Sequence, residues 1–421
     1  MDMDILEAEE SFDVNLPSKH TYLGDLREIH ATPYFAQGSL VSLPYVFVPD
    51  VVLMPNQHIP INVEPTDLDL SHLLKDVVDV EQSQSRPGFV CMAADIGYEV
   101  QQISQTHPYF LFGTVAAIVR VERRPNGGEA DEDDAGHGIK MIVKGCQRCL
   151  MTEAVSQDGD AQQFRYGRFR ILPDEIMESP LKVLTPPEWR NALLPNFCPA
   201  YLSRFSPALY GPFDVRDLVA EIKKEIITLQ LVPAERCQDD TDFSYWLAAS
   251  LPLPAHFRLQ LLGACSTVHR LRSCLLMLRN FNRLDCAICK VGLALKEDGI
   301  AMTRAGLTSA YINPGGLTQE IFTVKKVSNV RVFGQATTQY TWFPGYAWRH
   351  LQCRGCHNHL GWRYDALDGH LTPKLFYGLR RGDVVPNIQP QEGLSPAQLK
   401  EFYEEHEHAM MPVYYREPKS N

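Results

Sequence analysis

The sequence has no long hydrophobic run. None of its apolar stretches approaches the roughly 18 to 20 residues that cross a bilayer. The opening stretch, MDMDILEAEESFDVNLPSKH (1–20), has neither the basic region nor the apolar region of a signal peptide. We therefore expect a cytoplasmic and nuclear protein that has no membrane partner.

Positive charge is also in short supply. Lys and Arg number 40 against 51 Asp and Glu, which gives a net charge of −11. A protein that binds nucleic acid directly, or that lies on anionic lipid, needs a basic face. The overall charge argues against both kinds of partner, although a local basic patch is compatible with it.

Eleven cysteines, an odd number in a chain without a signal peptide, indicate thiols and metal ligands rather than a disulfide framework. Four of them form two C-x-x-C pairs, Cys286 with Cys289 and Cys353 with Cys356. Each pair offers two thiolates that converge on one point, and two pairs complete a tetrahedral Cys₄ site with no open position for catalysis. We expect one structural Zn²⁺, and the alternative is two unrelated thiol turns.

A third pair, Cys146 and Cys149, lies inside an expected strand. It is either a second metal or redox site or two half-buried thiols, and the strand favours the thiols. The pattern R-x-C-x-N at Arg354–Asn358 is similar to the reactive-cysteine stretch of B-type methionine sulfoxide reductases. Here Cys356 also closes a C-x-x-C pair, and a zinc-bound thiolate is a poor free nucleophile, so we interpret this match as chance.

At 421 residues the chain is too long for one ordinary core, and we expect several domains. The residue pattern predicts a multidomain α+β protein with five parts. They are an acidic N-terminal segment that is disordered or extended (1–37), a β-rich domain (38–172), a helical bundle (173–280), an all-β domain clipped by zinc (281–388), and a tail with a short helix that starts at Ser395 (389–421).

Local patterns predict some element boundaries. Prolines divide residues 41–63 into short strands. In the helical part, apolar residues at i, i+3 and i+4 predict three helices. The first has Asp214 as its N-cap, the second covers 241–251 with Asp242 as its cap, and the third runs without a break through 254–280.

Aromatic residues are concentrated near the C-terminal end. Three of the five tryptophans, Trp342, Trp348 and Trp362, follow one another closely, and a turn-forming FPGY separates the first two. Trp362 and Tyr364 share one face of an expected strand because they are two residues apart. A bend with two indoles that faces such a strand makes an aromatic box for a flat or cationic ligand. The alternative is a small aromatic core.

Four motifs in and around the cysteine pairs carry a specific resemblance. They are YINPGG (311–316), QYTWFPGYAW (339–348), QCRGC (352–356) and HLGWRYD (359–365). In this order they resemble the thalidomide-binding domain of the cereblon family. The N-terminal stretch PSKHTYLG (17–24) also resembles that family, residues 41–63 resemble the start of a Lon-protease N-terminal domain, and residues 242–262 resemble the family's helical segment. The resemblance covers roughly residues 15–388.

The resemblance implies a binding site. In that family three tryptophans wall a small cage that a cyclic imide enters edge-on, and backbone groups at the first tryptophan and two residues before it meet the imide. The matching residues here are Trp342, Trp348 and Trp362 as walls, Tyr364 as the floor, and Asn313 and Pro314 on the rim.

The chain departs from the family pattern at three places. Tyr340 stands where a histidine is common, two residues before the first tryptophan. A backbone contact survives this change, whereas a side-chain hydrogen bond would have to come from a phenol, which is larger and presents its donor further out. His350 stands where vertebrate members have a small apolar residue, on the face where a second protein would meet a bound drug. The segment 182–212, which contains Trp189, is shorter than the corresponding segment of the family. This difference affects the details of the contact with the adaptor protein.

The resemblance further implies the substrate receptor of a cullin-4 RING ubiquitin ligase. The helical part would bind the ligase's damaged-DNA-binding adaptor. The C-terminal domain would bind C-terminal cyclic-imide degrons and thalidomide-like glutarimides, which directs substrates to ubiquitination and proteasomal degradation. Such a subunit is not itself catalytic. The alternative is a redox enzyme similar to methionine sulfoxide reductases; a Lon-type peptidase is excluded because the phosphate-binding pattern G-x-x-x-x-G-K-[ST] is missing.

Overall fold

The computed structural model describes residues 10–29, 33–49, 51–63, 89–94, 112–122, 139–155, 166–175, 213–227, 229 and 237–388. The segment 182–212 with Trp189, and the tail helix expected from Ser395, lie outside these residues. Within them, no helix is both long enough and apolar enough to cross a membrane.

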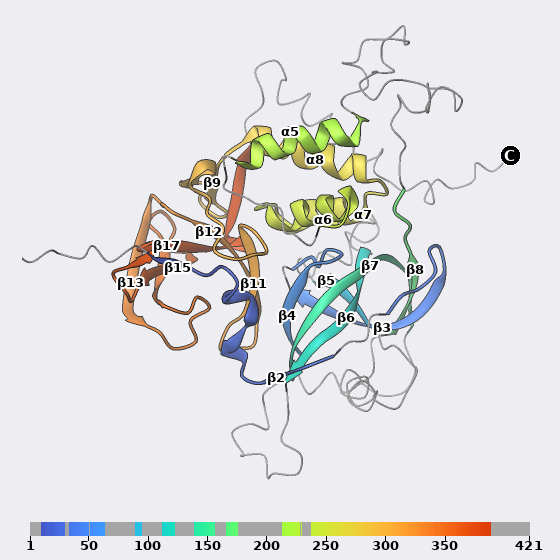
Figure 1. Ribbon diagram of the computed structural model, residues 1–421, viewed down its shortest axis with the longest axis horizontal. Coiled ribbons are helices and arrows are strands. Elements are labelled where there is room, and N and C mark those ends of the chain that lie inside the picture. Colours follow the sequence, from blue (N-terminus) through green and yellow to red (C-terminus); the bar gives the residue numbers. More distant parts are fainter. Residues whose placement is uncertain are drawn as a thin grey trace, which may run out of the picture.

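Two β-rich lobes and a layer of helices make up the described molecule (Figure 1). Strands from the N-terminal half, coloured blue to green, form one lobe, and strands from the C-terminal part, coloured orange to red, form the other. The helices lie along one side of both lobes. This architecture confirms the expected multidomain α+β fold.

The N-terminal lobe is a seven-stranded sheet in the order β2-β6-β5-β3-β8-β7-β4. A further pairing between β6 and β7 closes five of these strands into a ring. The strands are β2 (Leu26–Glu28), β3 (Leu40–Pro49), β4 (His58–Val63), β5 (Phe89–Ala94), β6 (Phe112–Glu122), β7 (Ile139–Val155) and β8 (Tyr166–Ile171).

Strand β3 corrects one expectation, since it continues through Pro44 instead of being divided there. Residues 40–44 pair with β8, and residues 45–49 pair with β5. Pro44 therefore lies where the strand changes partner, a place that tolerates the missing backbone N–H.

Helix α5 (Val215–Ile227) begins as expected, because the Asp214 carboxylate accepts a hydrogen bond from the Arg216 N–H at 2.9 Å (N to O). The start of α6 (Asp240–Ser250) differs from the expectation. Asp239 is its N-cap and accepts a hydrogen bond from the Asp242 N–H at 2.8 Å, so Asp242 lies in the first turn and is not the cap.

The helix expected over 254–280 is also a wrong prediction, because the structure has two helices there. They are α7 (Ala255–Gly263) and α8 (Thr267–Asn280). Ala264 is extended, and Ser266 caps α8 by accepting a hydrogen bond from the His269 N–H at 3.2 Å. Apolar periodicity continues across the break because both helices bury residues in the same core. The local sequence signal of the break is Ser266, the N-cap of the second helix.

The C-terminal lobe contains a six-stranded sheet in the order β11-β12-β17-β15-β14-β13 and a three-stranded sheet in the order β10-β9-β18, both antiparallel. The strands are β9 (Phe281–Cys286), β10 (Gly292–Leu295), β11 (Thr308–Ile312), β12 (Thr318–Val324), β13 (Val330–Thr337), β14 (Tyr346–Cys353), β15 (His359–Ala366), β17 (Leu375–Arg380) and β18 (Val384–Ile388). Two 3₁₀ turns accompany them, η7 (Lys296–Asp298) and η8 (Arg381–Asp383).

Residues 10–29 of the N-terminal segment are ordered, so the disordered alternative does not hold for this part of the predicted disordered or extended segment. Phe12 and Leu23 are buried, and the Tyr22 hydroxyl accepts a hydrogen bond from the Ile312 N–H at 3.0 Å. In Figure 1 this dark blue segment runs between the two lobes. Its elements are β1 (Glu10–Ser11), which pairs in parallel with β16 (Leu371–Thr372), then η1 (Pro17–Lys19), η2 (Thr21–Leu23) and β2.

A buried ionic triad joins the helices to the C-terminal lobe. Glu320 on β12 meets Arg258 of α7 at 2.7 Å and Arg381 of η8 at 2.9 Å (N to O). The Glu320 side chain is only 2% exposed, and Arg381 also donates to the carbonyls of Ala249 and Leu251 at the end of α6. One carboxylate thus stabilises two guanidinium groups that have little access to water.

We expect Glu320→Gln to lower the free energy of unfolding by about 3–5 kcal/mol, because it removes the carboxylate that pairs with two buried guanidinium groups. The measurement is urea unfolding followed by tryptophan fluorescence. The matched control is Glu221→Gln, which breaks an ion pair with Arg279. The Arg279 and Glu221 side chains are 41% and 44% exposed, so this substitution should cost under about 1 kcal/mol. Equal effects of the two substitutions would contradict this role for the triad.

Candidate zinc centre and aromatic site

The two cysteine pairs come together in space. Cys286 ends β9 and Cys353 ends β14, and the turn after each strand brings in Cys289 and Cys356. All four Sγ atoms lie within 4.8 Å of one another; Cys286 and Cys356 are 3.6 Å apart, and Cys289 and Cys353 are 3.5 Å apart. Thiolates at about 2.3 Å from a tetrahedral Zn²⁺ stand about 3.8 Å apart, so the donor set fits zinc.

The two turns have the same backbone geometry. In each, the residue after the second cysteine donates its N–H to the carbonyl of the first, Lys290 to Cys286 and His357 to Cys353, both at 3.0 Å (N to O). Both donors have left-handed φ angles, 61° in each case. A backbone hydrogen bond from Val291 lowers the pKa of the Cys289 thiol to about 7, whereas burial raises the pKa of the Cys353 thiol.

The third cysteine pair does not form a comparable site. Cys149 is buried in an apolar cluster with Val90 and Phe169, and burial raises the pKa of its thiol. Cys146 is half-buried, and its Sγ lies 3.5 Å from the Lys144 carbonyl oxygen. Within the described residues, the only group of three or more metal-ligating side chains that close together is the four-cysteine cluster.

Trp342 is held firmly at one side of the aromatic site. It is buried, its indole N–H donates to the Ile312 carbonyl at 3.1 Å (N to O), and its ring stacks on Tyr311 with centroids 5.0 Å apart. The ring of Trp362 stands at 75° to it, with centroids 4.8 Å apart. The residues between Trp342 and Tyr346 make the expected bend, in which Gly345 takes a φ of 91°.

Trp348 and Tyr364 complete this group of rings. They are direct partners across β14 and β15, so they share one face of the sheet with Trp362. Tyr364 is buried, whereas Trp348 and Trp362 are only partly buried and pack against the same cluster. We call Trp342, Trp348, Trp362 and Tyr364 the aromatic site.

The other three predicted site residues lie at its margin. The Trp348 N–H donates to the Gln339 carbonyl at 2.9 Å, which ties down the loop that carries Tyr340. The Tyr340 side chain is 55% exposed, and its φ is 54°. Asn313 and Pro314 follow directly after Ile312, the acceptor for Trp342, in a turn in which the Asn313 side chain accepts from the Leu317 N–H.

Sequence reasoning missed two contributors to this surface. Tyr311 backs Trp342, and its place in the same motif as Asn313 and Pro314, YINPGG, was the only sequence signal for it that we identify. The ring of His359 stands at 78° to Trp362, with centroids 5.1 Å apart, and it also contacts His350. His359 is three residues from Trp362, and in a regular strand this spacing would place the two side chains on opposite faces. The pairing of β14 with β15 shifts register between Leu351 and Gln352, which brings the two rings together.

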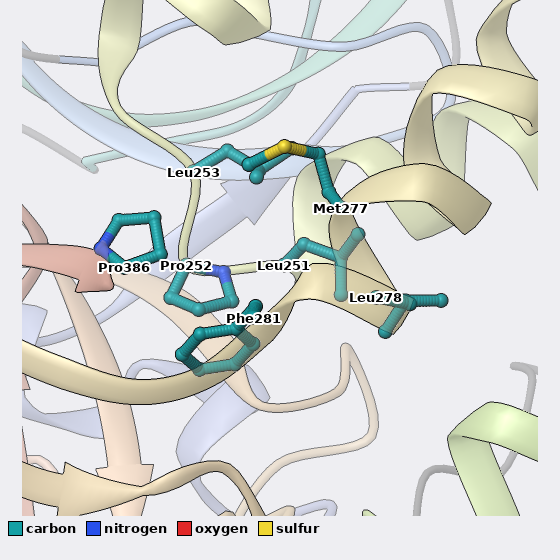
Figure 2. Close-up of a pocket in the computed structure, with 7 residues that line it drawn as sticks. All are labelled: Leu251, Pro252, Leu253, Met277, Leu278, Phe281 and Pro386. Atoms are coloured by element: carbon teal, nitrogen blue, oxygen red, sulfur yellow. The ribbon is translucent and has the colours of Figure 1, made fainter. Parts of the chain in front are cut away.

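A small pocket elsewhere is a less suitable candidate. Figure 2 shows it where the end of α6, helix α8 and strand β18 meet, and its lining is entirely apolar. The lining residues are Leu251, Pro252, Leu253, Met277, Leu278, Phe281 and Pro386. No side chain there can move a proton, and the thioether of Met277 is the one group in this lining that could ligate a metal.

Two family models match the chain. One, described as the ATP-dependent protease La (LON) substrate-binding domain, matches residues 42–280. The other, described as Yippee zinc-binding/DNA-binding /Mis18, centromere assembly, matches residues 283–388. The fold and the four-cysteine centre therefore define a Lon-type substrate-binding domain followed by a zinc-binding β domain.

Three curated relatives are similar along nearly the whole chain. Protein cereblon of Danio rerio is 30% identical over 92% of this chain and 91% of the relative, that of Gallus gallus 27% over 91% and 86%, and that of Xenopus tropicalis 28% over 91% and 87%. The chain belongs to the cereblon family. A solved structure, the N-terminal domain of Mycobacterium avium complex Lon protease, is 19% identical and covers 56% of this chain and 96% of its own, with a TM-score of 0.30, which adds nothing to the assignment.

Replacing one zinc ligand tests the metal centre. We expect Cys353→Ser to reduce bound zinc to well below one ion per chain and to destabilise the C-terminal lobe, because three thiolates leave the site incomplete. The measurement is metal content by atomic absorption together with thermal unfolding. Cys274→Ser, which replaces a buried thiol outside the cluster, is the control for loss of a thiol. Zinc near one ion per chain in Cys353→Ser would refute the assignment.

Proposed function

We propose that this chain is the non-catalytic substrate receptor of a cullin-4 RING ubiquitin ligase, and that its aromatic site binds a C-terminal cyclic imide. The observation that carries the proposal is the perpendicular pair Trp342 and Trp362 beside a partly exposed Trp348, within the motifs of the cereblon family. One structural Zn²⁺ holds the strands that bear these residues. The chain then acts in the cytoplasm and nucleus, where such ligases act.

The chemistry of an imide suits this site. A neutral cyclic imide is flat, has one N–H donor and two carbonyl acceptors, and is otherwise apolar. Its apolar faces gain about 25 cal/mol for each Å² that the indoles remove from water. Its polar edge needs partners, because an unpaired buried group costs about 1–3 kcal/mol. The backbone at Trp342 and Tyr340 supplies those hydrogen-bond partners. An open-chain amide cannot pair with them in the same way, so the site binds it less tightly.

The cysteine chemistry supports a binding protein rather than a reductase. Cys356, which the R-x-C-x-N pattern would make reactive, lies 3.6 Å from the Sγ of Cys286 inside the metal centre. A thiolate committed to zinc is a weak nucleophile. The chain therefore supplies recognition, and the other ligase subunits carry out ubiquitin transfer.

Adaptor binding is assigned to the helical part, and it is tested on the intact protein. Deleting the helices would be uninformative, because α8 and the C-terminal lobe share one apolar core. We expect the purified full-length chain to elute with the damaged-DNA-binding adaptor as a stoichiometric complex in size-exclusion chromatography. If the two proteins elute separately at micromolar concentrations, the proposed adaptor binding is contradicted.

Trp348→Ala is the direct test of the imide site. We expect it to abolish binding of a fluorophore-labelled glutarimide in an anisotropy titration while the melting temperature changes little, because Trp348 is partly exposed. Trp342→Ala should instead cost about 3–5 kcal/mol of stability, since that ring is buried and stacked. Trp246→Ala, at a partly buried indole on α6, is the control that should leave binding intact. Unchanged affinity in Trp348→Ala would refute the site.

Tyr340→His tests the departure from the family. If the backbone at this left-handed position makes the contact, the exchange should change glutarimide affinity by less than about tenfold, or about 1.4 kcal/mol. The same anisotropy titration measures it. A larger gain would show that the phenol hinders the site and that the natural ligand differs from a cyclic imide.

A further inference from the structure

The sheet face that carries the aromatic site continues toward the zinc centre with different chemistry. Phe333 on β13 pairs with His350 on β14, and His350 pairs with Trp362 on β15. His350 follows Trp348 by two residues and therefore shares its face. Leu351, which alternates with His350, is buried in the core on the opposite side.

Three rings form a continuous surface at this place. The rings of Phe333 and His350 are stacked with centroids 5.2 Å apart, and His350 and His359 are 5.4 Å apart. His350 also meets Trp348 edge-on at 5.2 Å, and His359 meets Trp362 at 5.1 Å. We call Phe333, His350 and His359 the imidazole shelf; it adjoins two walls of the aromatic site.

The shelf is bordered by cations. Arg331 lies two residues before Phe333 on β13 and therefore shares its face; it is exposed and has no ion pair among the described residues. Burial lowers the pKa of the His359 imidazole to about 4, and the positive charge of Arg380, at the end of β17, contributes to this shift. Asp383 forms an ion pair with Arg380 at 3.1 Å (N to O), which partly neutralises its charge. The same carboxylate raises the pKa of His359.

Acidic side chains are missing from this face of the sheet. Strands β13, β14, β15 and β17 contain a single carboxylate, Asp365. It alternates with Tyr364 and points to the other face, where Arg349 and Arg363 bind it. A chain of net charge −11 thus presents a locally basic and aromatic surface directly beside its candidate ligand site.

From this arrangement we infer that the imidazole shelf binds an acidic side chain of the partner protein, at the residue immediately before the C-terminal imide. The inference rests on the proposed function. Residues two apart on a strand are separated by about 7 Å, so His350 lies one side chain beyond Trp348. An extended peptide whose terminal ring occupies the aromatic site would place its preceding side chain over the shelf. Imidazole N–H groups and Arg331 then provide donors for a carboxylate.

The test compares peptides on the full-length, zinc-loaded protein. Acetylated peptides that end in the same cyclic imide carry Glu, Gln or Lys at the preceding residue, and each displaces a fluorophore-labelled glutarimide. We expect the Glu peptide to bind about fivefold more tightly than the Lys peptide, as partly exposed charge pairs allow. The preference should shrink in about 0.5 M NaCl, where the Debye length is about 4 Å.

Two substitutions locate the preference. Arg331→Gln and His350→Val should each reduce the Glu-to-Lys ratio to about twofold or less. Lys223→Gln, which removes an exposed cation on α5, should leave the ratio unchanged. If the labelled glutarimide binds but the wild-type protein shows equal affinity for the Glu and Lys peptides, the inference is overturned and the proposed function stands. A ratio that survives both substitutions also overturns it. If the labelled glutarimide does not bind at all, the proposed function fails and the inference fails with it.

Discussion

The C-terminal lobe depends on the convergence of four thiols. Cys286 belongs to the three-stranded sheet and Cys353 to the six-stranded sheet, so a metal bound by both pins two separate sheets together. Trp348 is part of the same strand as Cys353, and that strand is the partner of the one that carries Trp362. The metal centre therefore anchors one end of the strand whose other half carries Trp348.

The helices and the C-terminal lobe behave as one packed body. Leu271 and Leu278 of α8 lie in the same apolar cluster as Leu284 and Leu351 of the C-terminal sheets. The triad at Glu320 adds a buried polar link across the same boundary. Sequence texture placed a domain boundary near residue 281, yet a fragment cut there would expose apolar surface that the full chain buries. The two family models also meet at this boundary, at residues 280 and 283, so it divides two domains that share one apolar core.

Short motifs predicted the features that are local in the chain. The C-x-x-C turns specify their own geometry, and the spacing of Trp362 and Tyr364 specifies a shared face, so both could be read without a structure. Features set by distant partners could not be read in this way. The continuity of β3 depends on which strands flank Pro44, the break before α8 is hidden by continuous periodicity, and His359 reaches Trp362 through an irregular register. The residues alone left open the choice between an aromatic core and a ligand site, and the proposal of a ligand site rests on the resemblance to the cereblon family.

The N-terminal segment has a consequence for the order of folding. Its first described residue, Glu10, pairs with Leu371 near the far end of the chain, and Tyr22 bonds to Ile312. A ribosome adds about 5–20 residues per second, so these early residues wait for tens of seconds before their partners emerge. During synthesis the N-terminal lobe can close its ring of strands and pair β2 with β6 first, whereas residues 10–23 can dock only after the C-terminal lobe has been made. Residues 10–23 thus leave the ribosome well before the C-terminal lobe, yet they reach their native place only after that lobe has been made.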